Sequence, residues 1–282
     1  MTVGESILDA VQRLNRAGVE SPQADAEWLL AELMSCSRTE LSLCAETVLS
    51  AGQQDRLARQ LERRSSREPL QHILGVVDFF GYEFRVSPAV LIPRPETETL
   101  VELTLGLLKP FPSPVILDLG TGSGCVAISL AKRYPYAKVI ASDYSGAALQ
   151  LAQRNAKSLG VFGQMEFREA DGLASLAKGE QVDLITSNPP YIPTGEIAGL
   201  QPEVRHHDPP LALDGGGDGL KFYRMLAAEG RPHLKPSGKL VAEFGDRQEL
   251  HVGEIFRQAG WPSVEIAHDL SRRPRIVIAS PT

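Results

Sequence analysis

The chain has 282 residues, of which 43% are hydrophobic, so it is long enough to bury the core of one large domain or two modest ones. A formal net charge of -6 and a sequence pI of about 5.6 weigh against a general nucleic-acid binder, which needs clustered lysine and arginine to meet phosphates. Three cysteines without metal-ligand spacing, no signal peptide and no apolar run of roughly 18 residues lead us to expect a soluble protein of a reducing cytosol, without a disulfide framework, a metal or a membrane.

Residues 1–74 are predicted to form a small domain of helices. Ile7, Leu8, Val11 and Leu14 lie on one helical face, and Gly18 follows where a helix would end. Further helix starts are indicated by a Ser-Pro pair, by a threonine and by a Ser-x-x-Gln capping box, and the last of these helices would turn two leucines inward. The residues concerned are Ser21, Pro22, Thr39, Ser50, Gln53, Leu57 and Leu61, with Trp28, Leu29, Leu30 and Leu33 on the second helix.

The helix that starts near Ser50 carries a run of arginines: Arg56, Arg59, Arg63, Arg64 and Arg67. Such a run is most simply a solvated face. The alternative is a docking surface for RNA or for an RNA-bound partner.

Residues 75–92 change to short, aromatic-rich segments around Gly81, as in "DFFGYEFRV", which predicts a β-hairpin linker between two domains. The prolines of "LIPRPETETLVELTL" then precede a helix that is predicted to start near Glu96.

Residues 93–282 alternate between strands and helices. Strands are predicted at 115–119, 138–142, 165–169, 182–186 and 239–244, and "VEIAHDL" and "RIVIAS" suggest a final antiparallel pair. This alternation predicts an α/β domain with a parallel sheet covered by helices on both faces. In such sheets ligands bind at the carboxyl ends of the strands, near the point where the strand order reverses.

A glycine-rich loop, "DLGTGSGCVAISLA", follows the first of these strands, with Gly120, Gly122 and Gly124 before a helix. Asp143 ends the next strand, where a carboxylate can accept hydrogen bonds from ribose hydroxyls. The glycine spacing counted from Gly122 also satisfies a dinucleotide fingerprint, so the loop alone does not separate NAD from S-adenosyl-L-methionine. Asp118, just before the turn, favours S-adenosyl-L-methionine because it could face the cationic end of that cofactor.

"TSNPPYIP", residues 186–193, follows the fourth strand and should reach the same crevice. Pro189 and Pro190 fix their own φ angles and restrict the residues before them, which makes a stiff ledge. We expect the side-chain oxygen of Asn188 and the carbonyl of Pro189 to point into the site as acceptors, with Tyr191 supplying an aromatic face.

Two acceptors and a ring suit a planar group that carries an NH2, such as an amide or an exocyclic amine. Hydrogen bonds to both acceptors favour the electron-rich, pyramidal nitrogen, which is a stabilisation specific to the transition state. A sulfonium methyl held in line at about 3 Å would complete the geometry. The ledge therefore predicts an N-methyltransferase acting on an amide or amine.

With these motifs, the sequence resembles the peptide chain release factor glutamine methyltransferases, the PrmC/HemK family. The resemblance covers nearly the whole chain and rests on "REPLQHILG", "FFGYEFRVSPAVLIPRPETE", "ILDLGTGSGCVAISLA", "SNPPYIP", "LALDGGGDGL" and "DLSRRPRIVIA". It implies a class I, Rossmann-like, seven-stranded methyltransferase domain and an N-terminal helical domain that helps to grip the substrate protein. It also implies methylation of the side-chain amide of the glutamine in the Gly-Gly-Gln motif of class 1 release factors.

The resemblance also implies roles for individual residues. Asn188, Pro189 and Tyr191 would be catalytic, and Asn188 through Tyr191, with Pro190, would hold the glutamine amide. The cofactor S-adenosyl-L-methionine would be surrounded by Gly120, Thr121, Gly122, Ser123, Gly124, Asp143, Asp171, Gly172 and Asn188. We expect a cytoplasmic monomer that binds no nucleic acid stably.

Several features keep other interpretations open. Gly172 offers nothing to pack on adenine, and Arg272 replaces a glycine that is common in the last hairpin of the family. "GTGSGC" also resembles the sister enzymes that methylate a glutamine of a large-subunit ribosomal protein, although "RPETE" matches the release-factor branch. An adenine-N6 methyltransferase that acts on a flipped base, and a non-catalytic nucleotide-binding module, are the competing hypotheses.

Other candidate residues carry weaker signals. His206, His207 and Asp208 are residue types that bind metals, but no second cluster lies at ligand spacing from them. They lie in a long polar stretch, 194–219, which is predicted to be a mobile loop over the substrate. Asp214 and the run Gly215 to Gly217 would shape the return of that loop. Glu243 could contact the cofactor or cap a helix. Arg94 and Glu98 could lie beside the cofactor or form a structural ion pair.

Overall fold

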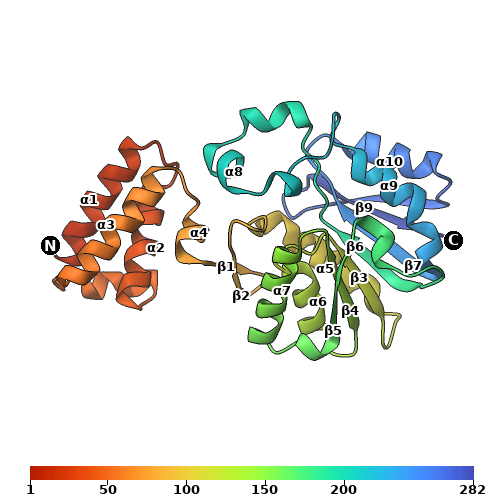
Figure 1. Ribbon diagram of the computed structural model, residues 1–282, viewed down its shortest axis with the longest axis horizontal. Coiled ribbons are helices and arrows are strands. Elements are labelled where there is room, and N and C mark those ends of the chain that lie inside the picture. Colours follow the sequence, from red (N-terminus) through yellow and green to blue (C-terminus); the bar gives the residue numbers. More distant parts are fainter. The chain divides into compact units, whose positions relative to one another are not determined.

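The computed structural model describes all 282 residues, which form two compact units. The first contains Met1–Val76 together with Gln201–His207, and the second contains Val77–Leu200 and Asp208–Thr282. Figure 1 labels the helices and strands of both units. The segment 201–207 lies far from the first unit in sequence, within the range predicted for the methyltransferase domain, and yet it belongs to the first unit.

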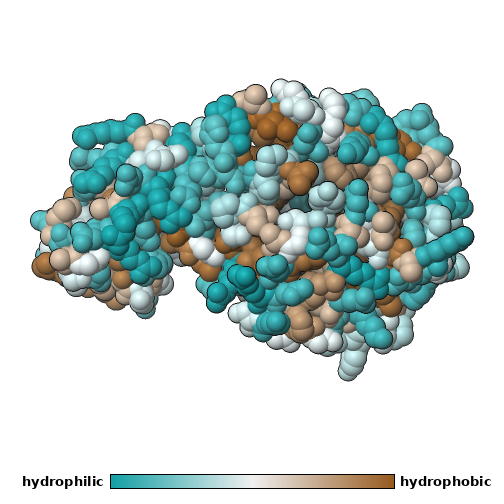
Figure 2. All heavy atoms as spheres, in the orientation of Figure 1, coloured by the Kyte–Doolittle hydropathy of each residue, from teal (hydrophilic) through white to brown (hydrophobic).

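The first unit is the predicted helical bundle. Its hydrophobic core is built from the inward faces of the helices and includes Leu14, Leu29, Leu30, Leu57 and Leu61, all of them buried. Figure 2 shows that hydrophilic residues cover most of this unit on the face in view. Its elements are α1 (Val3–Arg16), α2 (Pro22–Met34), the 3₁₀ helix η1 (Arg38–Cys44), α3 (Ala51–Ser65), α4 (Leu70–Leu74) and α8 (Pro202–His207).

Most of the predicted helix ends are present. Gly18 follows α1 with φ +73°, a conformation that glycine adopts without a steric penalty. Ser50 and Gln53 form the predicted capping box at the start of α3. Ser21 is the N-cap of α2 and Pro22 its first residue, as predicted, although the side chain of Ser21 makes no capping hydrogen bond. The helix predicted near Thr39 is the 3₁₀ helix η1.

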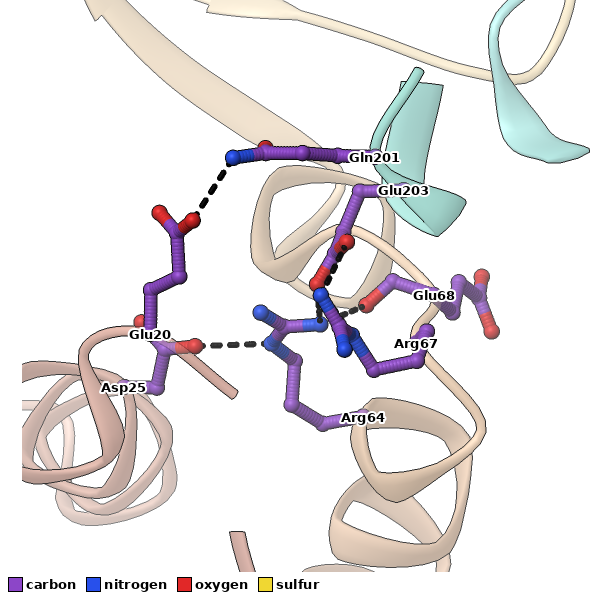
Figure 3. Close-up of polar contacts among 7 residues, drawn as sticks. All are labelled: Glu20, Asp25, Arg64, Arg67, Glu68, Gln201 and Glu203. Atoms are coloured by element: carbon purple, nitrogen blue, oxygen red, sulfur yellow. Dashed lines mark hydrogen bonds and ion pairs between the residues drawn. The ribbon is translucent and has the colours of Figure 1, made fainter. Parts of the chain in front are cut away.

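The arginines of α3 are largely neutralised by carboxylates of the same unit. Arg64 is buried between Asp25 of α2 and Glu203 of α8, at 2.7 and 3.0 Å, and Arg67 lies 2.7 Å from Glu203 (Figure 3). Outside this cluster, Arg56 pairs with Glu32 and Arg63 with Glu68. An arginine that already faces a carboxylate offers little to a phosphate, which disfavours an RNA-docking surface. The solvated face is wrong for Arg64, which is buried.

The β-hairpin predicted as a linker is packed into the second unit. It consists of β1 (Val76–Phe79) and β2 (Tyr82–Arg85), with Phe79 and Phe84 fully buried in the core beneath the sheet's helices. Asn155 accepts from the Arg85 amide at 3.0 Å and donates to the Arg85 carbonyl at 3.0 Å. The predicted linker therefore differs from the structure: two aromatic side chains and an asparagine bind it to the methyltransferase unit.

The second unit has the predicted seven-stranded sheet, in the order β5-β4-β3-β6-β7-β9-β8. The strand order reverses between β3 and β6, because β3 pairs in parallel with β4 on one side and with β6 on the other. β9 pairs antiparallel with both β7 and β8, as expected for the last two segments. The strands are β3 (Val115–Leu119), β4 (Lys138–Asp143), β5 (Met165–Glu169), β6 (Val182–Ser187), β7 (Leu234–Glu243), β8 (Ser263–His268) and β9 (Pro274–Ser280).

Helices cover both faces of this sheet (Figure 1). α5 (Glu98–Leu108), α6 (Cys125–Arg133) and α7 (Gly146–Ser158) pack on one face, and α9 (Lys221–Glu229) and α10 (Glu249–Gln258) pack on the other. Successive strand residues alternate between the two cores, as Ile116 and Leu117 do. Short 3₁₀ helices connect these elements: η2 (Pro95–Thr97), η3 (Phe162–Gln164), η4 (Gly172–Ser175), η5 (Thr194–Gly199), η6 (Pro210–Ala212) and η7 (Arg231–His233). No helix is both long and apolar enough to cross a membrane.

The buried ion cluster of the first unit predicts sensitivity to acid. Burial alone would raise the pKa of Glu203, but hydrogen bonds from Arg67 and Arg64 outweigh it and lower the pKa to about 2. A lowered carboxylate pKa stabilises the fold above the ordinary value of 4.5, and this contribution is lost as the pH falls from 4.5 towards 2. It amounts to about 3 kcal/mol at most, and Glu203→Gln should remove it at pH 7.

The measurement is the free energy of unfolding of the first unit, from urea titrations at pH 7 and pH 3. Trp28 fluorescence in a Trp261→Phe background reports on this unit alone. Glu203→Gln should be less stable than the parent at pH 7 and should lose less stability on acidification. The control, Glu62→Gln, removes an exposed carboxylate of α3 and should change stability at pH 7 by less than about 0.5 kcal/mol. Equal acid sensitivity of the parent and Glu203→Gln would contradict the assignment.

Candidate active site

A pocket of about 650 Å³ opens at the carboxyl ends of β3, β4 and β6, where the strand order reverses. All of its lining belongs to the second unit. The lining contains every residue predicted from the two motifs except Gly124 and Tyr191. The predicted residues that do line the pocket are Gly120, Thr121, Gly122, Ser123, Asp143, Asp171, Gly172, Asn188, Pro189 and Pro190. The tertiary structure thus brings the glycine loop and the proline ledge to one cavity.

The glycine loop turns directly from β3 into α6. The amides of Gly120 and Thr121 both donate to the carbonyl of Ser142, at 2.8 and 2.9 Å, which ties the loop to β4. Gly124 has φ +82°, and a Cβ there would lie 2.8 Å from Ile128 and 3.1 Å from Ala152. The predicted third glycine therefore does not face the pocket; it allows α6 to pack closely on α7.

Asp143 lies at the end of β4 with both carboxylate oxygens engaged by backbone amides. Gly122 donates to Oδ2 at 2.8 Å and Ser145 donates to Oδ1 at 2.9 Å. Burial raises the pKa of Asp143 against these hydrogen bonds. Each carboxylate oxygen can accept more than one hydrogen bond, so the carboxylate can still receive two hydroxyls of a ribose from the pocket.

Asp118 is buried at the end of β3 and lines the same pocket. Its Oδ2 accepts from the Thr121 hydroxyl at 2.6 Å and from the Ala127 amide at 3.2 Å, so it links the glycine loop to the start of α6. Burial raises the pKa of Asp118 to about 7. A cationic ligand in the pocket would favour the ionised form, which fits the positively charged methionine end of S-adenosyl-L-methionine.

Two side chains that the sequence did not single out also line the pocket and could pack on the base of a bound nucleoside. Tyr144 follows Asp143, lines the pocket and is 65% exposed, so its ring is free to stack on a base. Met225 of α9 also lines the pocket, and its Cε lies 3.4 Å from the position that a Cβ of Gly172 would take. The signal for Tyr144 was present in the sequence, as an aromatic residue next to the acid that ends a strand.

Asn188 extends from β6 with its side chain anchored on the protein. Its Nδ2 donates to the hydroxyl of Thr97 at 2.9 Å, and Thr97 is almost fully buried at the start of α5. Pro189 and Pro190 continue the pocket wall. With Nδ2 engaged, Oδ1 is the atom of Asn188 that is left to accept a hydrogen bond.

Tyr191 is placed differently from the prediction. It does not line the pocket, and its ring packs instead on the hydrophobic core around α9 and α10. Burial raises its pKa to about 12. Its carbonyl accepts from Gln248 at 2.9 Å, and a Cβ on Gly219 would come within 2.3 Å of the same oxygen. A Cβ on Gly245 would lie 2.8 Å from the Tyr191 ring, so glycines at 219 and 245 leave room for its carbonyl and its ring, and Tyr191 fastens the ledge from behind.

The polar stretch after the ledge divides between the two units. His206 and His207 end α8 in the first unit, whereas Asp208 lies in the second unit and accepts from Arg94 at 2.8 Å. No group of three or more histidine, cysteine or acidic side chains is arranged to hold a metal. Thr194 donates to Asp214 at 2.7 Å and the Thr194 amide donates to the Gly216 carbonyl at 3.0 Å, so the glycine run shapes the return of this stretch, as predicted.

Arg94 and Glu98 differ in their places. Arg94 lines the pocket and also forms an ion pair with Asp208, so its place at the pocket and its structural ion pair are compatible. Glu98 accepts from the amide of Phe80 at 2.7 Å and holds the β-hairpin. Glu98 is therefore structural.

Similar folds are found among solved methyltransferases. A methyltransferase of Pyrococcus furiosus matches with a TM-score of 0.52 and 19% identity, over 82% of this chain and 99% of that one. The catalytic domain of hMettl16, solved in complex with the MAT2A 3′UTR hairpin 6, matches with a TM-score of 0.59 and 15% identity, over 83% of each chain. With the pocket at the switch point of the sheet, these likenesses define the fold of a class I methyltransferase.

Sequence comparisons narrow this class. The family model described as PrmC N-terminal domain matches residues 5–75, and the model described as Methyltransferase small domain matches residues 99–199. Release factor glutamine methyltransferases of Koribacter versatilis and Moorella thermoacetica are each 41% identical to this chain, over 99% of it and 98% of their own length. The corresponding protein of Cereibacter sphaeroides is 42% identical over the same shares. The chain belongs to the release factor glutamine methyltransferase family.

The geometry of the pocket predicts that Asp143→Asn weakens cofactor binding. The substitution keeps the shape of the side chain but points an NH2 at a backbone amide or at a ribose hydroxyl. The lost acceptor should cost about 1.5 to 3 kcal/mol, which corresponds to a dissociation constant roughly ten- to hundredfold higher. Isothermal titration calorimetry with S-adenosyl-L-methionine measures it. Asp55→Asn, an exposed site on α3, is the control and should bind as the parent does.

Proposed function

We propose that this chain transfers a methyl group from S-adenosyl-L-methionine to the side-chain amide nitrogen of the glutamine in the Gly-Gly-Gln motif of class 1 peptide chain release factors. The observation that carries the proposal is the placement of Asn188, with its oxygen left to accept, in the same pocket as Asp143 and the glycine loop. The names of the relatives, which match this chain over nearly its full length, support the choice of substrate.

The residues of the pocket divide into two groups in this proposal. Gly120 to Ser123, Asp143, Asp171 and Gly172 would hold the cofactor, and Tyr144 would offer its ring to the adenine. Asn188, Pro189 and Pro190 hold the glutamine amide, while Tyr191 fixes the ledge to the core. S-adenosyl-L-methionine supplies an electrophilic methyl group on a sulfonium.

The ledge prepares the amide nitrogen for attack. The lone pair of an amide nitrogen is delocalised into the carbonyl, which makes the nitrogen a weak nucleophile. Asn188 Oδ1 and the Pro189 carbonyl accept the two N–H groups and favour the pyramidal, electron-rich form, a gain that is largest in the transition state. The methylated nitrogen is acidic enough to lose its proton to water, so the pocket needs no separate general base.

The predicted domain of residues 1–74, which lies in the first unit, serves in this proposal as the domain that recognises the release factor. The match of residues 5–75 to a family-specific N-terminal domain supports this role. The segment 201–207, which follows the ledge in sequence, is held to α2 and α3 by the Arg64 cluster and by a 2.7 Å hydrogen bond from Gln201 to Glu20 (Figure 3). The chain that leaves the substrate ledge is thus anchored on the domain assigned to the partner.

The protein is also proposed to act as a cytoplasmic monomer without stably bound nucleic acid. The paired arginines of α3 and the net charge of -6 weaken a role for RNA. Class 1 release factors act in translation, which places the substrate in the cytoplasm.

The deciding experiment is methyl transfer from labelled S-adenosyl-L-methionine to a purified class 1 release factor. Label should enter the native factor but not a variant with Gln→Ala in the Gly-Gly-Gln motif. Asn188→Ala should lower the transfer rate roughly a hundredfold or more, because an acceptor used mainly in the transition state is removed. Ribosomal protein and DNA are offered in parallel. Label on either of these, and none on the release factor, would show that the substrate is another molecule and would refute the proposal.

A further inference from the structure

The side-chain amide of Asn188 is asymmetric, and its use in the proposed reaction depends on which way round it lies. Only Oδ1 can accept a hydrogen bond from a substrate NH2; if the amide turned over, Nδ2 would face that NH2, donor against donor. In the structure Nδ2 donates to Thr97 Oγ1 at 2.9 Å, so Oδ1 is the atom left to accept from the substrate. Some feature of the protein must therefore select this orientation.

Thr97 by itself would not select it. A hydroxyl is both a donor and an acceptor, so Thr97 could equally donate to Oδ1 of a reversed amide. What can remove this ambiguity is Glu243, which the strand register places beside Asn188 and whose buried carboxylate interacts with the side chains of Thr97 and Asn188. An ionised carboxylate only accepts, so the Thr97 proton is directed to Glu243 and the Thr97 oxygen is left as an acceptor for Nδ2.

The sheet explains why these residues meet. Ser187 of β6 pairs with Ala242 of β7, so Asn188 and Glu243 follow at the ends of neighbouring parallel strands. Thr97 approaches from η2, directly before α5. Glu243 is only 2% exposed and Thr97 is 2% exposed, so water does not compete for these hydrogen bonds.

Glu243 is costly for the fold. Its Oε2 has no hydrogen-bond partner although the side chain is buried, and burial raises the pKa of Glu243 to about 7 despite the neighbouring Thr97 hydroxyl and the positive charge of Arg275. A buried carboxylate with an unpaired oxygen lowers stability relative to an apolar side chain of similar size. A purely structural role would be better filled by an uncharged residue.

We propose that Thr97 and Glu243 are positioning residues that hold the Asn188 amide with Nδ2 on the protein side and Oδ1 towards the substrate. The proposal rests on the proposed function and deepens it, since it makes the site selective for a group that donates from nitrogen. The site then accepts a glutamine amide and rejects the carboxylate of glutamate, which has no N–H to offer to Oδ1. Neither residue touches the reacting atoms.

The main test compares Thr97→Val with Thr97→Ser and Thr104→Val. Valine keeps the shape of threonine but removes the hydroxyl, serine keeps the hydroxyl, and Thr104 is a buried threonine of α5 whose hydroxyl has no hydrogen-bond partner. Thr97→Val should lower kcat roughly ten- to hundredfold, with the affinity for S-adenosyl-L-methionine changed less than about threefold. Thr97→Ser and Thr104→Val should stay within about threefold of the parent in kcat. Parental kcat in Thr97→Val would overturn the proposal.

A second readout needs no substrate. The chain has three asparagines, Asn15, Asn155 and Asn188, so selective ¹⁵N labelling of asparagine yields three side-chain NH2 signals. Asn188 should show a proton contact with Thr97 and slow exchange with solvent in the parent and lose both in Thr97→Val. Asn155, held by Ser123 and Arg85 carbonyls, is the internal reference. An Asn188 signal that is unchanged in Thr97→Val would overturn the proposal even if the parent methylates no release factor.

Glu243→Gln tests the direction of the Thr97 proton. Glutamine presents either an oxygen or an NH2 to Thr97, so the selection is weakened at every pH. In the parent, kcat should fall as the pH drops through about 7, because protonated Glu243 can donate to Thr97; this limb should be absent in Glu243→Gln. The other polar or charged groups that face Glu243 are Glu96, Tyr191, Tyr223, Cys125 and Arg275. The same acidic limb in Glu243→Gln would assign it to one of them and refute the role of Glu243.

Discussion

The site depends on the parallel pairing of β3 with β4 on one side and with β6 on the other. At that reversal the helices that follow β3 and β6 leave in opposite directions, so the carboxyl edge of the sheet opens into a crevice rather than being closed by a loop. The glycine loop leaves β3 there, Asp143 ends β4 there, and the proline ledge leaves β6 there. Segments about seventy residues apart in the chain therefore reach one pocket through backbone hydrogen bonds alone.

Around this crevice the structure uses buried polar groups to hold short segments in place. Asp118 fastens the glycine loop to α6, Asp143 fastens it to the start of α7, and Thr97 with Glu243 fastens the Asn188 amide. Each of these carboxylates is held where burial raises its pKa. Such groups cost stability, and they are tolerated because they fix the geometry of atoms that a ligand must meet.

In the first unit, by contrast, charged side chains of opposite sign are paired with one another away from water. The Arg64 cluster joins α2, α3 and α8, and thereby takes a segment from the middle of the methyltransferase sequence into the N-terminal unit (Figure 3). The arginine run of α3 was open to two interpretations in the sequence. Its partners Glu32, Glu68, Asp25 and Glu203 come from other helices or turns, so only the folded chain could decide between them.

Local pattern was enough to predict the strands, the order of the motifs and most of the helices, because period-two and period-3.6 hydrophobicity, capping residues and glycines act over a few neighbours. It was also enough for Asp143, Asn188 and the glycine loop, since residues that follow parallel strands share one edge of the sheet. The resemblance carried by "NPPY" and "RPETE" supplied the family. What the tertiary structure alone decided depends on distant neighbours. Tyr191 packs on the core where Gly245 leaves room for its ring, the predicted linker is bound by Asn155, and the Asn188 amide donates to Thr97.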